Sequence, residues 1–177
     1  MVIVLDEPEY TLHFGVYGVV IEQGHILCIH KNSGPYKNRY DLPGGSQEPG
    51  EGLTETLVRE VYEETGQKVK KYSHPRIYDT FIKPHTKSVT THHVFALYTV
   101  SLHEEVSDLP LYVADGLNDS DGVTWVKISE LNELNASPLI LKVLDEQSNK
   151  ETTIDKSRYE HWTVIDKKLN NNQNQRR

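Results

Sequence analysis

Residues 41–67 read DLPGGSQEPGEGLTETLVREVYEETGQ and join a glycine turn to the clearest helical pattern in the chain. After Gly52 the apolar residues recur at helical spacing, at Leu53, Leu57, Val58 and Val61. Gly66 is well placed to end such a helix, because glycine adopts the left-handed conformation that often follows the last helical turn. We therefore predict a helix over about 52–65.

Three glutamates, Glu60, Glu63 and Glu64, lie near the end of this predicted helix. Like charges at these spacings repel, and the C-terminal end of a helix already carries partial negative charge. On a helical wheel the three side chains fall within an arc of about 100°. Carboxylates grouped in this way suit Mg²⁺ or Mn²⁺, which prefer oxygen ligands, so the pattern predicts a bound divalent cation. The alternative is a solvated acidic face, which is the usual meaning of a charge run.

Neighbouring residues favour the cation. The glycine pair at 44–45 lets the backbone approach a ligand closely, because glycine has no Cβ. Glu48 and Glu51 add carboxylates just upstream of the helix. Arg59 precedes Glu63 by one helical turn, so the two side chains can form an ion pair that orients the carboxylate.

The same residues resemble the signature of the Nudix hydrolase family. In that signature a glycine is followed after five residues by a glutamate, and after seven more by Arg-Glu-U-X-Glu-Glu-X-Gly-U, where U is a bulky aliphatic residue. Here the match runs Gly45, Glu51, and then REVYEETG at 59–66. Gln67 departs from the aliphatic final position, which normally packs. A weaker resemblance extends across residues 11–147.

The resemblance implies a fold and a reaction. The expected fold class is α/β, with a mixed β-sheet sandwiched between helices as in the α/β/α Nudix fold. Nudix enzymes cleave the pyrophosphate linkage of a nucleoside diphosphate joined to another group X, by attack of a metal-activated water on phosphorus. The expected cofactor is therefore Mg²⁺, with Mn²⁺ as a substitute, and the expected partner is a small nucleotide substrate.

The resemblance also assigns roles by position. Glu60, Glu63 and Glu64 would ligate the metal together with the backbone carbonyl of Gly45. Glu60 is in addition the candidate that takes a proton from the attacking water, and Arg59 would orient Glu63. The catalytic candidates are thus Glu60, Glu63 and Arg59.

Further candidates lie near the signature. Arg39, Gly44 and Glu48 are candidates for binding the substrate, although a loop arginine is more often simply exposed. Asp119 and Asp121 belong to a polar loop from which, in relatives, an acid can add a metal ligand or act as a base. A turn rich in Asn, Asp and Gly is the competing interpretation of that loop.

Composition limits the class of partner. The chain has 177 residues, with 19 Lys and Arg against 26 Asp and Glu, which gives a net charge of −7. This balance argues against binding to nucleic acid polymers or to anionic membrane surfaces. We find no signal peptide and no apolar run long enough to span a membrane, so we expect a cytoplasmic monomer or homodimer. The single cysteine, Cys28, excludes an intrachain disulfide and reads as a buried apolar residue of a strand.

Other segments complete the predicted domain. Strands are expected over 11–22, 25–31, 89–101 and the stretch VTWVKI, and a helix should begin at Ser137-Pro138 and run to about 146. We assign residues 1–150 to one Nudix domain. Residues 151–177 are predicted to form a helix around 155–169, followed by a frayed polar tail.

Several functions remain open at this point. About 44 residues precede the signature, whereas relatives that cleave ADP-ribose often carry a longer N-terminal region. This favours a MutT-like enzyme acting on (deoxy)nucleoside triphosphates over an ADP-ribose or nucleotide-sugar pyrophosphatase. A non-catalytic nucleotide-binding domain and a partner-binding scaffold are alternatives from other classes.

Overall fold

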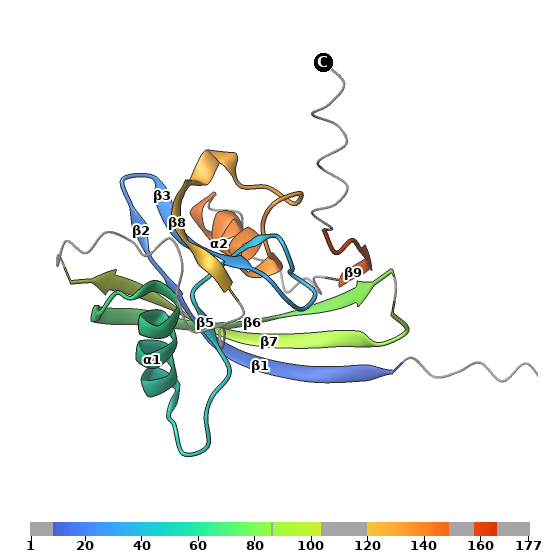
Figure 1. Cartoon of the computed structure of the whole chain (residues 1–177), viewed down its shortest axis with the longest axis horizontal. Helices are drawn as coiled ribbons and strands as arrows, with labels where there is room; N and C mark the ends of the chain where they lie inside the picture. The colour runs from blue at the N-terminus through green and yellow to red at the C-terminus, as the bar shows by residue number, and fades with distance from the viewer. Residues whose placement is uncertain (1–8, 86, 104–119, 149–157, 166–177) are drawn as a thin grey trace, which may run out of the picture.

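A computed structural model describes residues 9–85, 87–103, 120–148 and 158–165 (Figure 1). Its larger sheet is mixed and has five strands, in the order β5 (Gly44–Gly45), β1 (Tyr10–Val19), β7 (Thr90–Leu102), β6 (Val69–Pro84) and β9 (Arg158–Trp162). The pairs β1–β7 and β6–β9 are parallel, whereas β5–β1 and β6–β7 are antiparallel. The mixed sheet confirms the predicted fold class.

A smaller sheet lies beside the first. It contains β2 (Ile21–Glu22), β3 (His25–Lys31), β4 (Tyr40–Asp41) and β8 (Ser120–Lys127), and both β4 and β8 pair antiparallel with β3. A turn at Gln23-Gly24 joins β2 to β3, and both of its residues have positive φ. A short 3-10 helix, η1 (Ile128–Glu130), follows β8.

Two helices pack on opposite faces of the larger sheet (Figure 1). Helix α1 (Leu53–Thr65) ends as predicted at Gly66, which has a φ of 68° and donates its N–H to the Tyr62 carbonyl at 2.8 Å. Helix α2 (Pro138–Gln147) has Ser137 as its N-cap, also as predicted. No helix in these described ranges is long and apolar enough to cross a bilayer.

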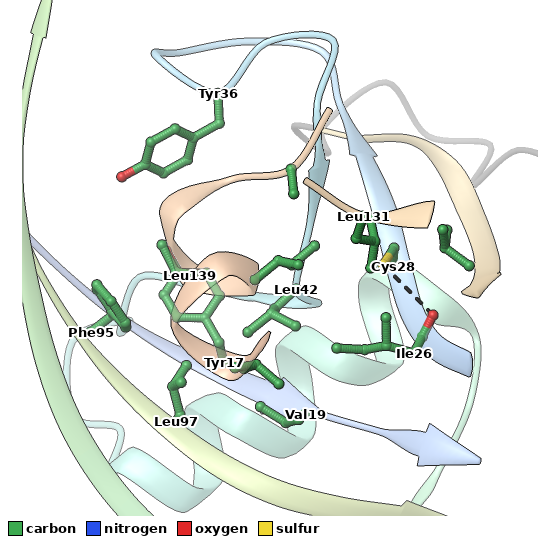
Figure 2. Packing of buried hydrophobic residues seen from close by; sticks show 14 of the residues in the cluster. Tyr17, Val19, Ile26, Cys28, Tyr36, Leu42, Phe95, Leu97, Leu131 and Leu139 are labelled. Carbon is green, nitrogen blue, oxygen red and sulfur yellow. Dashed lines mark hydrogen bonds between the residues drawn. The ribbon is translucent and has the colours of Figure 1, made fainter. Parts of the chain in front are cut away.

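Alternation along β1 separates two apolar cores. Val16 packs in the core beneath α1, with Leu57 and Val61 of that helix, whereas Tyr17 faces the core beneath α2. Figure 2 shows the second core, where side chains from the sheets and α2 converge around Tyr17 and Leu139. Cys28 is fully buried there and its thiol faces the Ile26 carbonyl, which confirms the predicted apolar role.

The C-terminal segment differs from the prediction. Residues 158–162 form strand β9, so the helix expected around 155–169 is wrong over these residues; the others in that range beyond 158–165 lie outside the described part. The helix was expected because Tyr159 and Trp162 are three residues apart. A bulge produces this spacing, since Ile82 pairs with Tyr159 while Pro84 pairs with Trp162. The extra residue in β9 lets side chains three apart share one face, which imitates a helical period.

Candidate active site

The three glutamates near the end of α1 line a cavity of about 570 Å³ between the helix, the glycine strand β5 and the loop after β3. Helix α1 lies against both β1 and β5, so its carboxylate side faces the backbone of Gly44 and Gly45. The side chains of Glu60, Glu63 and Glu64 all reach the cavity wall. The spacing that is costly on an isolated helix therefore places three carboxylates at one cavity.

Glu64 is the most deeply placed of the three. Its residue is 4 % exposed, and its Oε2 accepts a hydrogen bond from the Gly44 N–H at 2.8 Å. Burial raises the pKa of the Glu64 carboxyl to about 8, and nearby Glu60 adds to the rise. Lys31 and the hydrogen bond from the Gly44 N–H lower the pKa of Glu64, but by less than burial raises it. Without a cation, this environment favours the protonated carboxyl near neutral pH.

Glu60 lies directly over Gly45. A Cβ at Gly45 would be 2.7 Å from Glu60 Oε1, a distance that real Cβ contacts do not show. Only glycine therefore lets the carboxylate approach the turn this closely. Burial raises the pKa of Glu60, although hydrogen bonding from Arg59 lowers it. Glu63 is the outer member, with a side chain that is 45 % exposed.

Arg59 connects this helix to the preceding loop. Its guanidinium contacts Glu51 at two points, Nε–Oε1 at 2.6 Å and Nη2–Oε2 at 2.9 Å. Single contacts reach Glu60 Oε1 at 2.9 Å and Glu63 Oε2 at 3.0 Å, and Nη2 also donates to the Ser46 carbonyl. The predicted pair with Glu63 is present, but the two-point partner is Glu51.

The donor set fits a hard divalent cation. The side-chain donors are carboxylates, and Glu64 is a buried carboxylate that makes no ion pair within the described part of the chain. Such burial is costly unless a positive charge compensates it. These carboxylates line one cavity but do not surround a single cation position. Among the described residues, no three acidic, histidine or cysteine side chains are placed around a common ion position. Instead, Arg59 holds Glu60 and Glu63.

A different wall of the cavity is built from tyrosine and histidine. The Tyr36 hydroxyl lies 2.9 Å from His93 Nδ1, and the Tyr17 hydroxyl lies 3.2 Å from His93 Nε2. Burial lowers the pKa of His93 to about 3, so the ring is neutral and offers one donor and one acceptor. The His13 ring contacts the same ring in a tilted arrangement, with 4.6 Å between the centroids. This wall carries no formal charge at neutral pH from its tyrosines or from His93.

Asp41 is a site residue that the sequence did not indicate. Its carboxylate lines the cavity although the residue is only 1 % exposed. Oδ1 accepts from Ser137 Oγ at 2.6 Å and from the Leu42 N–H at 2.9 Å. Burial raises its pKa. The only available signal was its position immediately before Leu42 and the Pro43-Gly44-Gly45 turn, which the signature does not include.

Known proteins resemble this chain in sequence and in fold. The model of the NUDIX domain matches residues 9–147. The chain belongs to the Nudix family. The solved MutT Nudix hydrolase from Burkholderia pseudomallei superposes with a TM-score of 0.61 at 20 % identity, covering 76 % of this chain and 97 % of that one. At this identity the likeness supports the fold alone.

Two curated relatives match shorter stretches. A protein named ADP-ribose pyrophosphatase from Methanocaldococcus jannaschii is 42 % identical over 65 residues, which is 34 % of this chain and 38 % of the relative. A putative 8-oxo-dGTP diphosphatase from Bacillus subtilis is 36 % identical over 72 residues, 37 % of this chain and 46 % of the relative. The matched stretches thus span less than half the length of either relative.

Most of the predicted site residues in the Nudix signature line the cavity, whereas some of the other predicted residues do not. The cavity is lined by Gly45, Glu48, Arg59, Glu60, Glu63 and Glu64. Gln67, the departure from the signature, is buried at 8 % exposure, so its position packs as expected. The Gly44 N–H, expected near substrate, is already donated to Glu64.

Arg39 does not line this cavity. It is buried and donates to the Glu133 and Thr163 carbonyls, at 2.7 and 3.1 Å, so its interpretation as a substrate-binding residue is wrong. Nothing in the loop sequence distinguished this buried arginine from an exposed one. Asp121 is exposed and accepts from the Asn32 side chain at 3.0 Å, and it is not among the residues that line the cavity. Asp119 lies outside the described residues.

Proposed function

We propose that this protein is a divalent-cation-dependent hydrolase that cleaves the pyrophosphate linkage of a nucleoside diphosphate joined to another group. Membership of the Nudix family supports this reaction class. The observation that carries the proposal is the arrangement of Glu60, Glu63 and Glu64 beside Gly45 on the wall of one cavity. A cavity of about 570 Å³ is within the range that small-molecule ligands occupy.

The residues at the cavity have proposed roles in binding the cation and in activating water. Glu60, Glu63, Glu64 and the Gly45 carbonyl would hold Mg²⁺, or Mn²⁺ in its place. The cation, when bound, would neutralise the diphosphate and lower the pKa of a bound water. Glu60 is our candidate for the group that takes the proton from the attacking water. An acidic protein can bind an anionic substrate in this way, because the cation reverses the local charge.

Arg59 is proposed as a positioning residue. Its contacts with Glu51, Glu60 and Glu63 fix both the loop before α1 and the outer carboxylates. Because the guanidinium is planar and donates from several nitrogens, it restrains orientation as well as distance. Glu48 lies on the same loop, and its N–H donates to Glu51 Oε2 at 3.0 Å. We therefore assign Glu48 to the rim of the site rather than to the chemistry.

We propose two candidate substrates, which experiments can distinguish. A (deoxy)nucleoside triphosphate is the first candidate, and the name of the Bacillus subtilis relative, a putative 8-oxo-dGTP diphosphatase, is compatible with it. ADP-ribose is the second, favoured by the relative named ADP-ribose pyrophosphatase. A non-catalytic nucleotide-binding domain is a separate possibility, against which the presence of every glutamate of the signature argues.

A nucleotide panel tests the proposal. Purified protein is incubated with dGTP, 8-oxo-dGTP, ATP, ADP-ribose and a nucleotide sugar, with Mg²⁺ and with EDTA, and products are identified by chromatography. We expect Mg²⁺-dependent release of a mononucleotide from at least one compound. Binding without product in every case would instead support the non-catalytic alternative.

A further inference from the structure

Residues 158–165, here called the C-terminal clamp, are tied to the loop between β3 and β4. This cavity loop comprises residues 32–39. Three hydrogen bonds join them: Trp162 Nε1–H to the Pro35 carbonyl at 2.6 Å, Arg39 Nη2–H to the Thr163 carbonyl at 3.1 Å, and the Asn38 side-chain amide to the Ile165 carbonyl. Each bond joins a side chain to backbone, and the donors come from both segments. The loop and the clamp therefore hold each other in one arrangement.

Trp162 is the centre of this attachment. The residue is 5 % exposed, and the Arg39 guanidinium lies 4.1 Å from its ring centroid. The rings of Tyr159 and Tyr36 meet it edge to face, at 5.0 and 6.1 Å between centroids. The indole is thus enclosed by aromatic and cationic groups, and its single donor is used by the cavity loop.

The clamped loop forms part of the cavity wall. Ser33, Gly34, Pro35 and Tyr36 all line the cavity that holds the glutamates. Tyr36 extends the connection inward, because its hydroxyl bonds His93, whose other nitrogen faces the Tyr17 hydroxyl. None of the glutamates of α1 belongs to this wall. It therefore suits the portion of a substrate that extends beyond the diphosphate, such as a base or a sugar.

We propose that Trp162 is a positioning residue that fixes this wall and thereby sets the affinity for the nucleoside portion of the substrate. The inference rests on the proposed function and adds a specificity element to it. The match to the NUDIX domain ends at residue 147, so the clamp lies outside the stretch that defines the family.

The expected kinetic effect is on KM. A wall that contacts an unreactive part of the substrate interacts equally with the ground state and the transition state. Loosening it raises KM and leaves kcat nearly unchanged, whereas damage to the carboxylate site lowers kcat. A residue with a purely structural role would instead lower the melting temperature and alter neither constant below that temperature.

Paired tryptophan substitutions provide the test. Trp162→Phe keeps an aromatic ring but removes the donor to Pro35. Trp125→Phe is the matched control, because Trp125 lies on β8 against the other core and does not line the cavity. With the best substrate of the panel, we expect Trp162→Phe to raise KM at least fivefold with kcat within twofold, and Trp125→Phe to change neither by more than twofold. Unchanged KM in Trp162→Phe, or an equal rise in both variants, would overturn the inference.

A binding measurement covers the case in which Trp162→Phe does not fold. Because the chain has two tryptophans, Trp162 is the only one left in Trp125→Phe. We expect AMP or dGMP to change the fluorescence of Trp162 in this variant saturably. No change in Trp162 emission with either nucleotide would contradict a link between clamp and cavity. Failure of the proposed function is distinguishable, since it appears as absence of turnover in the unsubstituted protein.

Discussion

Arg59 holds Glu51 at two points, through contacts of 2.6 and 2.9 Å that span eight residues of the chain. The hydrogen bonds from Arg59 lower the pKa of Glu51 to about 2. The same guanidinium reaches Glu63 at only one point. Two residues of the signature are therefore used to join the loop after the glycine strand to helix α1, so that the carboxylates of the helix face a fixed loop.

Replacing Arg59 with Lys tests this connection. Lysine keeps the positive charge but cannot make the two-point contact, so the loop and the outer carboxylates should lose their relative position. We expect kcat to fall about tenfold or more, which corresponds to about 1.4 kcal/mol, while the melting temperature changes by only a few degrees. Steady-state kinetics and thermal unfolding on the same preparation decide the point. Unchanged kcat would leave Arg59 as an ion-pair residue without a role in activity.

The Arg59–Glu51 pair should also act as a unit. We expect Glu51→Gln to reduce kcat to a similar extent as Arg59→Lys, because either change breaks the two-point contact. The double variant should then be little worse than either single one, since residues in one network are not additive. A double-mutant cycle on kcat measures this coupling. Fully additive losses would show that the two residues affect activity independently.

Gly45 tests the close approach of Glu60. The added methyl of Gly45→Ala would meet the Glu60 carboxylate, which is the movable end of a side chain, so the fold should survive while the carboxylate shifts. We expect a loss of kcat of about tenfold or more, on the scale of about 1.4 kcal/mol. Gly52→Ala is the control, because its methyl would lie 3.3 Å from Glu55 Oε2, outside the cavity. Equal activity of the two alanine variants would contradict the packing described for Glu60.

Much of this site could be predicted because its residues are close in sequence. The helix, its end at Gly66 and the grouping of Glu60 with Glu64 follow from helical period and glycine chemistry, which act locally. The two-point contact from Arg59 to Glu51 was missed, because a helical wheel reveals only neighbours three or four residues apart. The sequence shows a glutamate eight residues before the arginine, but their contact can be predicted only when the conformation of the loop is known.

The residues that were missed depend on distant parts of the chain. Asp41 is held beside the cavity by a hydrogen bond from Ser137, which is 96 residues away. Arg39 is buried and donates to backbone carbonyls that are 94 and 124 residues away. Strand β9 was mistaken for a helix because a bulge imposed by pairing with β6 produced a three-residue spacing. Such features arise from tertiary packing, which local propensity does not encode.

His93 should make stability depend on pH. Burial lowers its pKa to about 3, whereas an unfolded histidine titrates near 6.5. Below pH 6.5 His93 therefore binds a proton in the unfolded chain but not in the folded protein. The free energy of unfolding consequently falls as the pH falls toward 3. Urea unfolding at pH 7 and pH 5 should show this loss, and His93→Gln should reduce the difference by about 2 kcal/mol. An identical difference in the variant would mean that His93 is not held neutral.

The central claim is that the buried carboxylate of Glu64 serves a cation required for hydrolysis. Its most direct test is the kcat of Glu64→Gln at saturating Mg²⁺, with Glu22→Gln, an exposed glutamate on β2, as control. Glutamine keeps the size of the side chain but removes the carboxyl group. Without the cation the variant should unfold less readily than the parent, because burial raises the pKa of Glu64 and the parent must therefore take up a proton to fold at neutral pH. We predict that kcat falls by about 10² or more, on the scale of about 3 kcal/mol, while Glu22→Gln keeps the parent value. Near-normal turnover of Glu64→Gln would contradict the assignment.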